Sequence, residues 1–170
     1  MRIMKHLITL ILAVMTIGMV SAQNYIVVNS EKVFKSIDEY NKALNQIEEL
    51  SATYQKSVDV KFQEVERLYN SYVEQRASLS ASARQAYEQN ILQKEAEATK
   101  YQESLFGTDG ELMKRRLELI QPIQQRVFEV IEQFAKAQGY DLVIDIAANP
   151  TVLYYSESVN RTQAIIESLK

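Results

Sequence analysis

The stretch "YDLVIDIAANPTVLYYS", residues 140–156, decides the fold of this chain because it breaks a long helical pattern. The residues before it are rich in Gln, Glu, Ala, Lys and Leu, which favour helix. Within the stretch, β-branched and aromatic residues flank a turn at residues 148–150, and they predict a β-hairpin of residues 142–146 and 152–155. A two-stranded hairpin is only marginally stable in water, so this one needs a partner.

The partner strand is expected near the other end of the chain, in "YIVVN" (residues 25–29). Ser30 can cap a short helix directly after it, and "SIDE" (residues 36–39) has the capping-box form that starts a second helix. No Gly or Pro then occurs before Gly107. A helix of about 40 residues would span ~60 Å, so it must project from a domain of this size.

Two amphipathic helices are predicted to form an antiparallel hairpin. Apolar residues recur at spacings of three and four along residues 38–77 and again along residues 82–106. The polar stretch between them, residues 77–82, marks the tip and offers Ser80 or Ser82 as the cap of the second helix. Each apolar stripe supplies the partner that the other needs. The N-terminal strand and the C-terminal hairpin then meet at the base of this arm.

The returning helix is interrupted at "FGTDGELM", residues 106–113. Gly107 can end one helix, and Thr108 can cap the next. Pro122 removes a further backbone donor and should bend the helix. We expect either a local kink or a hinge within the arm, with Gly107, Gly110 and Pro122 as the hinge residues.

The chain therefore divides into a body and an arm. The arm is expected at residues 38–117, and the body combines residues 23–37 with residues 118–170. In the body, Gly139 ends the long helix and Asn160 can cap a last short one. The predicted fold class is α+β, a small β-sheet body with a long antiparallel helical-hairpin (coiled-coil) arm. Three strands leave two open edges that copies of the same chain could close, so we expect an obligate symmetric oligomer.

The first 22 residues have the features of a secretory signal peptide. Arg2 and Lys5 precede an apolar run at residues 7–20, and small residues lead to Ala22. Cleavage is expected after Ala22, which would export the mature chain. A membrane anchor is the alternative, but the apolar run is shorter than the ~20 residues that span a bilayer.

The composition excludes several kinds of site. The chain has no cysteine, and its one histidine, His6, lies in the expected signal peptide, so the mature chain has no disulfide, imidazole base or ordinary zinc site. It keeps 17 basic and 22 acidic residues, a net charge of −5, which does not favour nucleic acid. It has no nucleotide-binding glycine motif, and no cofactor is expected. Asp141 and Asp145 could pair for catalysis, but their spacing fits the polar face of a strand, so no enzyme is predicted.

Three segments stand in order around the helical hairpin: "YIVVNSEKVFK" (residues 25–35), "LIQPIQQRVFEVIEQFAKAQGYDLVID" (residues 119–145) and "NRTQAIIESL" (residues 160–169). Together they resemble the Skp/OmpH family of periplasmic chaperones for outer-membrane proteins, over the whole mature chain. The resemblance implies a homotrimer in which three chains build a β-barrel-like body and three arms enclose a cavity. It also implies a holdase that binds unfolded outer-membrane proteins without ATP.

Two features depart from the pattern of that family. Its best-known members are strongly basic and attract acidic clients and lipopolysaccharide, whereas residues 38–116 here carry 11 basic and 14 acidic residues. This balance disfavours contact with lipopolysaccharide or a membrane. The glycines at 107 and 110 also interrupt a helix that is expected to be unbroken in the family.

A holdase needs many weak apolar contacts, and tyrosine suits this because its ring can be buried while its hydroxyl stays in water. Phe62 and Tyr69 lie beside the predicted seam between the helices, whereas the other candidates lie on it and could instead cement the two helices together. A structural or scaffolding coiled-coil protein of the cell envelope is the alternative function. The candidate client-binding residues are Tyr54, Phe62, Tyr69, Tyr72, Tyr87 and Tyr101.

Overall fold

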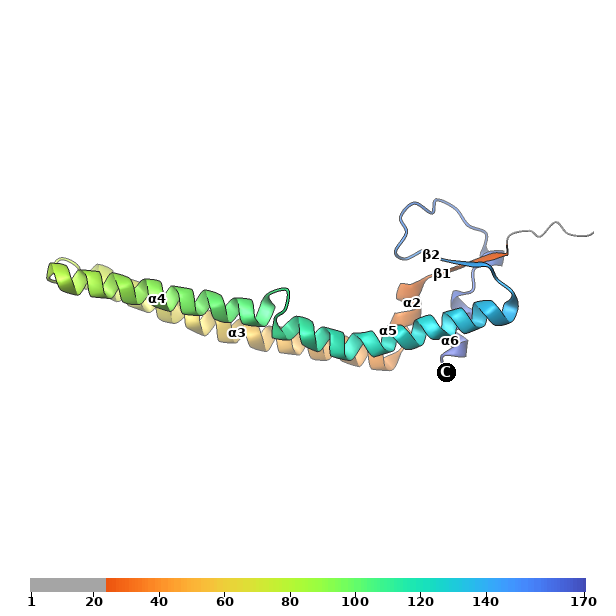
Figure 1. Ribbon diagram of the computed structural model, residues 1–170, viewed down its shortest axis with the longest axis horizontal. Helices are drawn as coiled ribbons and strands as arrows, with labels where there is room; N and C mark the ends of the chain where they lie inside the picture. The colour runs from red at the N-terminus through yellow and green to blue at the C-terminus, as the bar shows by residue number, and fades with distance from the viewer. Residues whose placement is uncertain (1–23) are drawn as a thin grey trace, which may run out of the picture. The chain divides into compact units, whose positions relative to one another are not determined.

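The computed structural model describes residues 24–170, and the expected signal peptide lies outside them. Most of the described chain is helical with a small two-stranded sheet, which confirms the α+β class (Figure 1). The elements in chain order are β1 (Tyr25–Val28), α2 (Ser30–Lys35), α3 (Asp38–Gln75), α4 (Ala81–Phe106), α5 (Glu111–Gln138), β2 (Leu142–Asp145), the 3₁₀ turn η1 (Glu157–Val159) and α6 (Thr162–Ser168).

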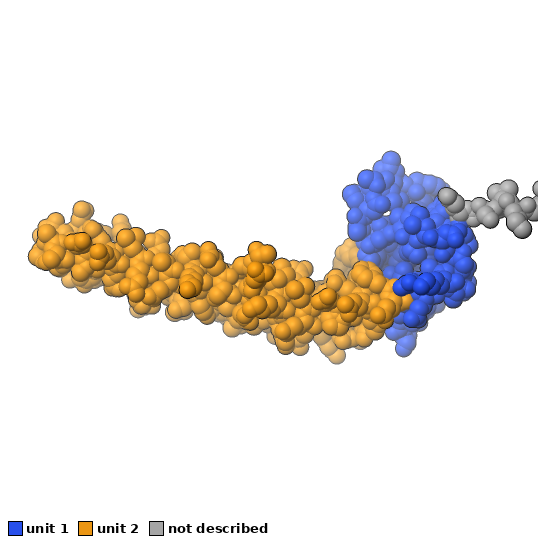
Figure 2. All heavy atoms as spheres, in the orientation of Figure 1, with its two compact units in different colours: residues 1–30, 130–170 blue, residues 31–129 orange. Residues whose placement is uncertain are grey.

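The described chain forms two compact units (Figure 2). One unit combines residues 24–30 with residues 130–170 and holds both strands, η1 and α6. The other unit is residues 31–129 and holds α3, α4 and the first part of α5. In the second unit, α4 and the first part of α5 lie beside α3 and are antiparallel to it (Figure 1).

The two strands pair in parallel, with Val27 of β1 opposite Ile144 of β2. This pairing confirms that the N-terminal strand and the segment at residues 142–146 come together. A parallel pair requires a long crossover connection, and the helical arm supplies it. Ile26, Val27 and Val28 are at most 1% exposed, so β1 is the buried strand. On its other edge the Arg161 N–H donates to the Val27 carbonyl at 3.0 Å.

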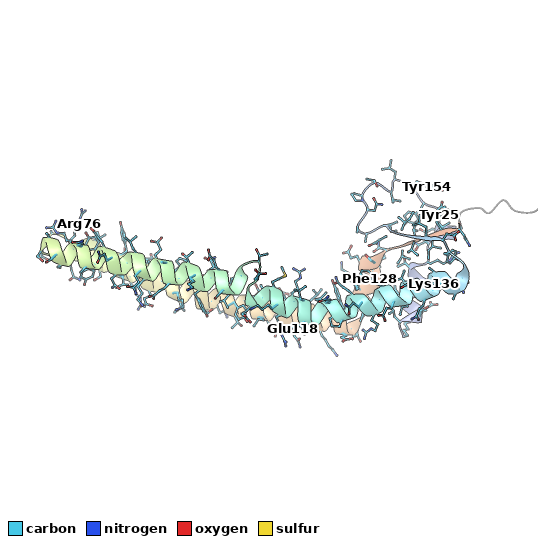
Figure 3. The ribbon with its side chains drawn as sticks, viewed as in Figure 1. Tyr25, Arg76, Glu118, Phe128, Lys136 and Tyr154 are labelled. Carbon is cyan, nitrogen blue, oxygen red and sulfur yellow. The ribbon has the colours of Figure 1, made fainter. Side chains whose placement is uncertain are left out.

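The predicted β-hairpin is wrong, because residues 152–155 form no strand. Leu153 and Tyr154 are 94% and 86% exposed, and Tyr154 extends from the loop that follows β2 (Figure 3). In that loop the Asn149 side-chain oxygen accepts from the Thr151 N–H at 3.2 Å, a local turn that does not pair the following residues with β2. β-Propensity does not produce a strand unless a neighbouring edge is in register.

The caps of the arm helices follow the predictions in part. Ser80 caps α4, since its hydroxyl oxygen accepts from the Ala83 N–H at 3.2 Å. The predicted capping box at residues 36–39 is wrong, because Ile37 occupies the cap position of α3. The Ser36 hydroxyl instead donates to the Val33 carbonyl at 2.7 Å. It serves the unsatisfied carbonyls at the end of α2, which stops immediately before α3 begins.

The break between α4 and α5 is a compact loop. Gly107 ends α4 as expected, and its N–H donates to the Glu103 carbonyl at 2.8 Å. The Gly110 N–H donates in turn to the Gly107 carbonyl at 2.9 Å. Thr108 does not cap α5, which begins directly after Gly110. A Cβ atom at Gly110 would lie 2.7 Å from the Leu105 carbonyl oxygen, so the tightness of the loop requires glycine there.

The remaining helix ends also show why the chain turns where it does. α5 continues through Pro122 and ends at Gly139, whose φ of +71° is in the left-handed region that favours glycine. Asn160 contributes to the start of α6, because its side-chain oxygen accepts from the Thr162 N–H at 3.0 Å.

Candidate functional site

The seam between α3 and α4 is built partly from stacked aromatic rings. Tyr72 is 6% exposed, and its ring stacks on that of Tyr87 with centroids 6.0 Å apart. Nearer the break, Tyr54 meets Phe106 edge to face at 6.3 Å. Tyr54, Tyr72 and Tyr87 are positions that the three-and-four spacing predicts on one face of each helix, whereas Phe106 lies outside that pattern.

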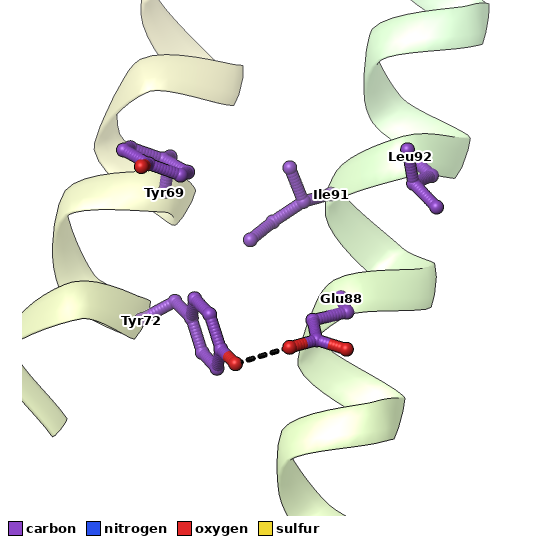
Figure 4. Close-up of a pocket in the computed structure, with 5 residues that line it drawn as sticks. All are labelled: Tyr69, Tyr72, Glu88, Ile91 and Leu92. Carbon is purple, nitrogen blue, oxygen red and sulfur yellow. Dashed lines mark hydrogen bonds between the residues drawn. The ribbon is translucent and has the colours of Figure 1, made fainter. Parts of the chain in front are cut away.

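The tyrosine hydroxyls of the seam also have protein partners. Tyr101 donates to the Ser57 hydroxyl at 3.2 Å, and the Lys61 ammonium lies 4.9 Å from the Tyr101 ring centroid. Tyr72 donates to the Glu88 carboxylate (Figure 4). This hydrogen bond, together with burial, raises the pKa of the Tyr72 hydroxyl. The structure thus places Tyr54, Tyr72, Tyr87 and Tyr101 in contacts that join the two helices.

Phe62 and Tyr69 lie instead on one exposed flank of the arm. Phe62 is 36% exposed and Tyr69 is 55% exposed. Val73, which is 54% exposed, lies one turn after Tyr69, and Leu92 of α4 is 64% exposed. We call these four residues the apolar flank. Sequence reasoning missed Val73 and Leu92, although the one-turn spacing from Tyr69 would have identified Val73.

A shallow groove joins the two helices on this flank (Figure 4). Tyr69 from α3 and Leu92 from α4 form its sides, Tyr72 and Ile91 also line it, and Glu88 adds a carboxylate. Its volume is about 300 Å³. A groove with a mostly apolar lining, two tyrosine hydroxyls and one carboxylate suits a single apolar side chain of an extended polypeptide.

Contacts on either side of the break show that residues 107–110 are looped out of the helix pairing. Tyr54 meets Phe106, and Glu39 pairs with Arg126 at 2.7 Å. Glu39 and Tyr54 are 15 residues apart along α3, whereas Phe106 and Arg126 are 20 residues apart along the returning chain. The loop therefore accounts for most of the difference, and α3 continues past it without interruption.

The third residue considered for a hinge, Pro122, lies in a packed part of α5. Ile120 and Ile123 on either side of it are 7% and 2% exposed, and both pack with Ala43 of α3. The Gly107–Gly110 loop and Pro122 are therefore separate features of the returning chain.

The family model described as "Outer membrane protein (OmpH-like)" matches residues 24–169, which include the whole arm and both strands. The chain belongs to the OmpH-like family. This confirms the resemblance seen in the three sequence segments. OmpH-like proteins are periplasmic chaperones of outer-membrane proteins, not enzymes. The comparison with curated proteins gives no match.

The two carboxylates considered for catalysis have structural roles in this OmpH-like chain. Asp145 accepts from the Ser30 N–H at 3.1 Å, the Ser30 hydroxyl at 2.6 Å and the Ala147 N–H at 3.0 Å. Burial raises the pKa of Asp145, but these hydrogen bonds outweigh it, so the pKa lies below its ordinary value. Asp141 accepts from the Asn24 N–H at 3.4 Å. Asp145 thus fixes the start of α2 to the end of β2.

Neither a metal site nor a membrane span is found in the part of this OmpH-like chain that the structure describes. Within residues 24–170, no three histidine, cysteine or acidic side chains are grouped so that they could hold a metal ion. Over the same residues, every helix is too short or too polar to cross a bilayer.

Proposed function

We propose that this protein is an ATP-independent holdase that binds unfolded outer-membrane proteins on the apolar flank of its arm. The observation that supports this most is the exposure of Phe62, Tyr69, Val73 and Leu92 on one flank, while the seam beside them is closed by its own contacts. Contiguous exposed apolar residues on a soluble surface indicate a site of interaction. The seam tyrosines then shape the groove rather than contact most of the client.

The chemistry of the flank matches that of an unfolded outer-membrane β-barrel. The strands of such a client alternate apolar and polar residues, so they offer regularly spaced apolar side chains. A shallow groove gives each of these side chains a weak contact, and no single contact is strong enough to prevent release of the client. When the client folds into a membrane it buries these side chains, so binding reverses by mass action without a nucleotide.

We also propose that three chains associate through their sheet-containing units. Two observations support this: Leu153 and Tyr154 are exposed in a strand-forming segment, and β2 pairs only with β1 in the described chain. A neighbouring subunit would cover both features. Three arms on one particle would then bind a client multivalently, and this can raise affinity by a factor of about 10²–10⁴.

A hinge in the arm is a further part of the proposal. The helical hydrogen bonds of the returning chain stop at Gly107 and resume after Gly110, and Pro122 donates none. Bending there would change the space between arms. Substitution of Gly107 by alanine is unsuitable as a test, because the added Cβ atom would lie 2.4 Å from the Glu103 carbonyl oxygen. Deletion of residues 107–110 should narrow the distribution of distances between spin labels at the arm tips, near Arg76 (Figure 3). An unchanged distribution would remove the hinge.

The holdase proposal is tested by adding the mature protein to a denatured outer-membrane β-barrel as it is diluted into buffer. We expect turbidity to be suppressed at a near-stoichiometric amount of trimer, and light scattering to give three times the mass of the chain. A scaffolding coiled-coil protein would leave the turbidity unchanged. A monomer at micromolar concentration would contradict the shared body.

A further inference from the structure

The apolar flank is bordered by carboxylates. In α3, Glu66 lies one turn after Phe62 and about one turn before Tyr69, and residues at these spacings share a helix face. In α4, Glu88 lies one turn before Leu92, and both line the same groove. The border therefore has acidic side chains from both helices.

A second hollow continues this border along α4. Its volume is about 580 Å³, and it shares Leu92 with the first groove. Glu95 and Glu103 line it, together with one cation, Lys100. An extended segment that crosses Leu92 would therefore meet carboxylates in both hollows.

The ion pairs of residues 24–170 include none with Glu66, Glu88 or Glu95. Glu88 accepts a hydrogen bond from Tyr72, but a neutral hydroxyl does not cancel its charge. The nearby Arg76 partly offsets the rise in pKa of the Tyr72 hydroxyl, but it forms no ion pair with Glu88 in the described chain. The border therefore carries a net negative charge, because its four carboxylates outnumber its two cations, Arg76 and Lys100. The four carboxylates are those of Glu66, Glu88, Glu95 and Glu103.

The opposite face of α4 is different, because its charges are paired. Glu97 lies two residues after Glu95, which places it roughly 200° around the helix. Its carboxylate pairs with Lys94 at 3.2 Å, and Lys94 also approaches Glu64 of α3 at 3.8 Å. The uncompensated negative charge of this region therefore lies beside the exposed apolar residues.

We infer that the apolar flank selects unfolded segments in which aromatic or aliphatic residues stand next to lysine or arginine. This rests on the proposed holdase function and adds a preference among its clients. The apolar side chain enters the groove at Leu92, and the cation reaches Glu66 or Glu95 beside it. An exposed ion pair changes affinity by roughly twofold to fivefold, so two such pairs change it by about tenfold.

Two fluorescent peptides test this selection. Both are unstructured and have the same apolar positions, but the positions between them are lysine in one and glutamate in the other. We expect the mature protein to bind the lysine peptide about tenfold more tightly at low salt, and the ratio to approach one near 0.5 M salt as screening increases. Glu66→Gln with Glu95→Gln should reduce the low-salt ratio to about twofold. Glu64→Gln with Glu97→Gln removes the same charge from the opposite face and should leave the ratio unchanged.

The outcomes separate this inference from the function on which it rests. Equal binding of both peptides, or tighter binding of the glutamate peptide, overturns the selection, and suppressed aggregation of the β-barrel would show that the holdase remains. Equal effects of the two double variants also overturn it, because net charge alone would then explain the preference. If neither peptide binds and the β-barrel aggregates, the holdase proposal fails and the selection fails with it.

Discussion

Replacing Tyr69 with serine should weaken client binding without unfolding the arm. A tyrosine side chain can bury about 200 Å², and 55% of Tyr69 is exposed, so a client can cover about 100 Å² of it. At about 25 cal/mol per Å² this is about 2.5 kcal/mol. Ordering the client and the ring offsets about half of it. We expect Kd for an unfolded β-barrel to rise about tenfold, measured by fluorescence titration of one labelled client.

Val60 supplies a matched control on the same helix. It is 61% exposed and lies nine residues before Tyr69, which places it roughly 180° around α3. We expect Val60→Ser to change Kd by less than about twofold, and both variants to keep their helical circular dichroism, because neither residue belongs to the seam. Equal losses in the two variants, or no loss in Tyr69→Ser, would refute the assignment of the apolar flank as the binding surface.

Three further predictions concern stability, each measured by urea unfolding at fixed protein concentration. Ile165 of α6 is fully buried, so Ile165→Ala should lower the free energy of unfolding by about 3 kcal/mol; a loss below about 1 kcal/mol would show that α6 does not pack there. Asp145→Asn should cost about 1 kcal/mol at pH 7. Because folding lowers the pKa of Asp145, the difference in unfolding free energy between the two proteins should be fully present above pH 3.8, the ordinary pKa of this side chain, and should disappear as the pH falls through the folded-state pKa. A difference that grows in acid would contradict this role. Gly139→Ala should cost about 1 kcal/mol because of the positive φ, and an unchanged unfolding midpoint would show that the helix does not need this end.

The helices of the arm could be predicted because their stability depends on a pattern that is local in sequence. Tyr72 and Tyr87 lie on opposite helices, yet each is marked by three-and-four spacing within its own segment. The meeting of residues 25–28 with residues 142–145 followed from the out-and-back path of the chain. Both inferences use information that a single chain contains.

The errors occurred where local preference depends on context. Residues 152–155 have high β-propensity, but Leu153 and Tyr154 have no partner strand within the described chain. Ser36 is a residue type that caps helices, but its hydroxyl binds the Val33 carbonyl at the end of α2 instead. The two glycines predict a break at residues 107–110, but the sequence does not show that these residues loop out, because the seven-residue separation of Leu105 and Leu112 also fits one face of an uninterrupted helix.

The apolar flank could be predicted only in part, because exposure depends on how two helices are rotated against each other. Phe62 and Tyr69 were separated from the seam by their spacing alone. Leu92 follows Ile91 directly, and only the rotation of α4 decides which of the two faces α3 and which stays 64% exposed.

Site-specific photo-cross-linking tests most directly whether clients lie on the apolar flank. A photoreactive phenylalanine analogue would replace Tyr69, Leu92 or Val60 in the mature protein, which is then illuminated with an unfolded outer-membrane β-barrel. We expect cross-links from positions 69 and 92, little from position 60, and loss of all of them once the client has folded into lipid. Equal yields from all three positions, or suppressed aggregation without cross-links from 69 and 92, would contradict binding on this flank.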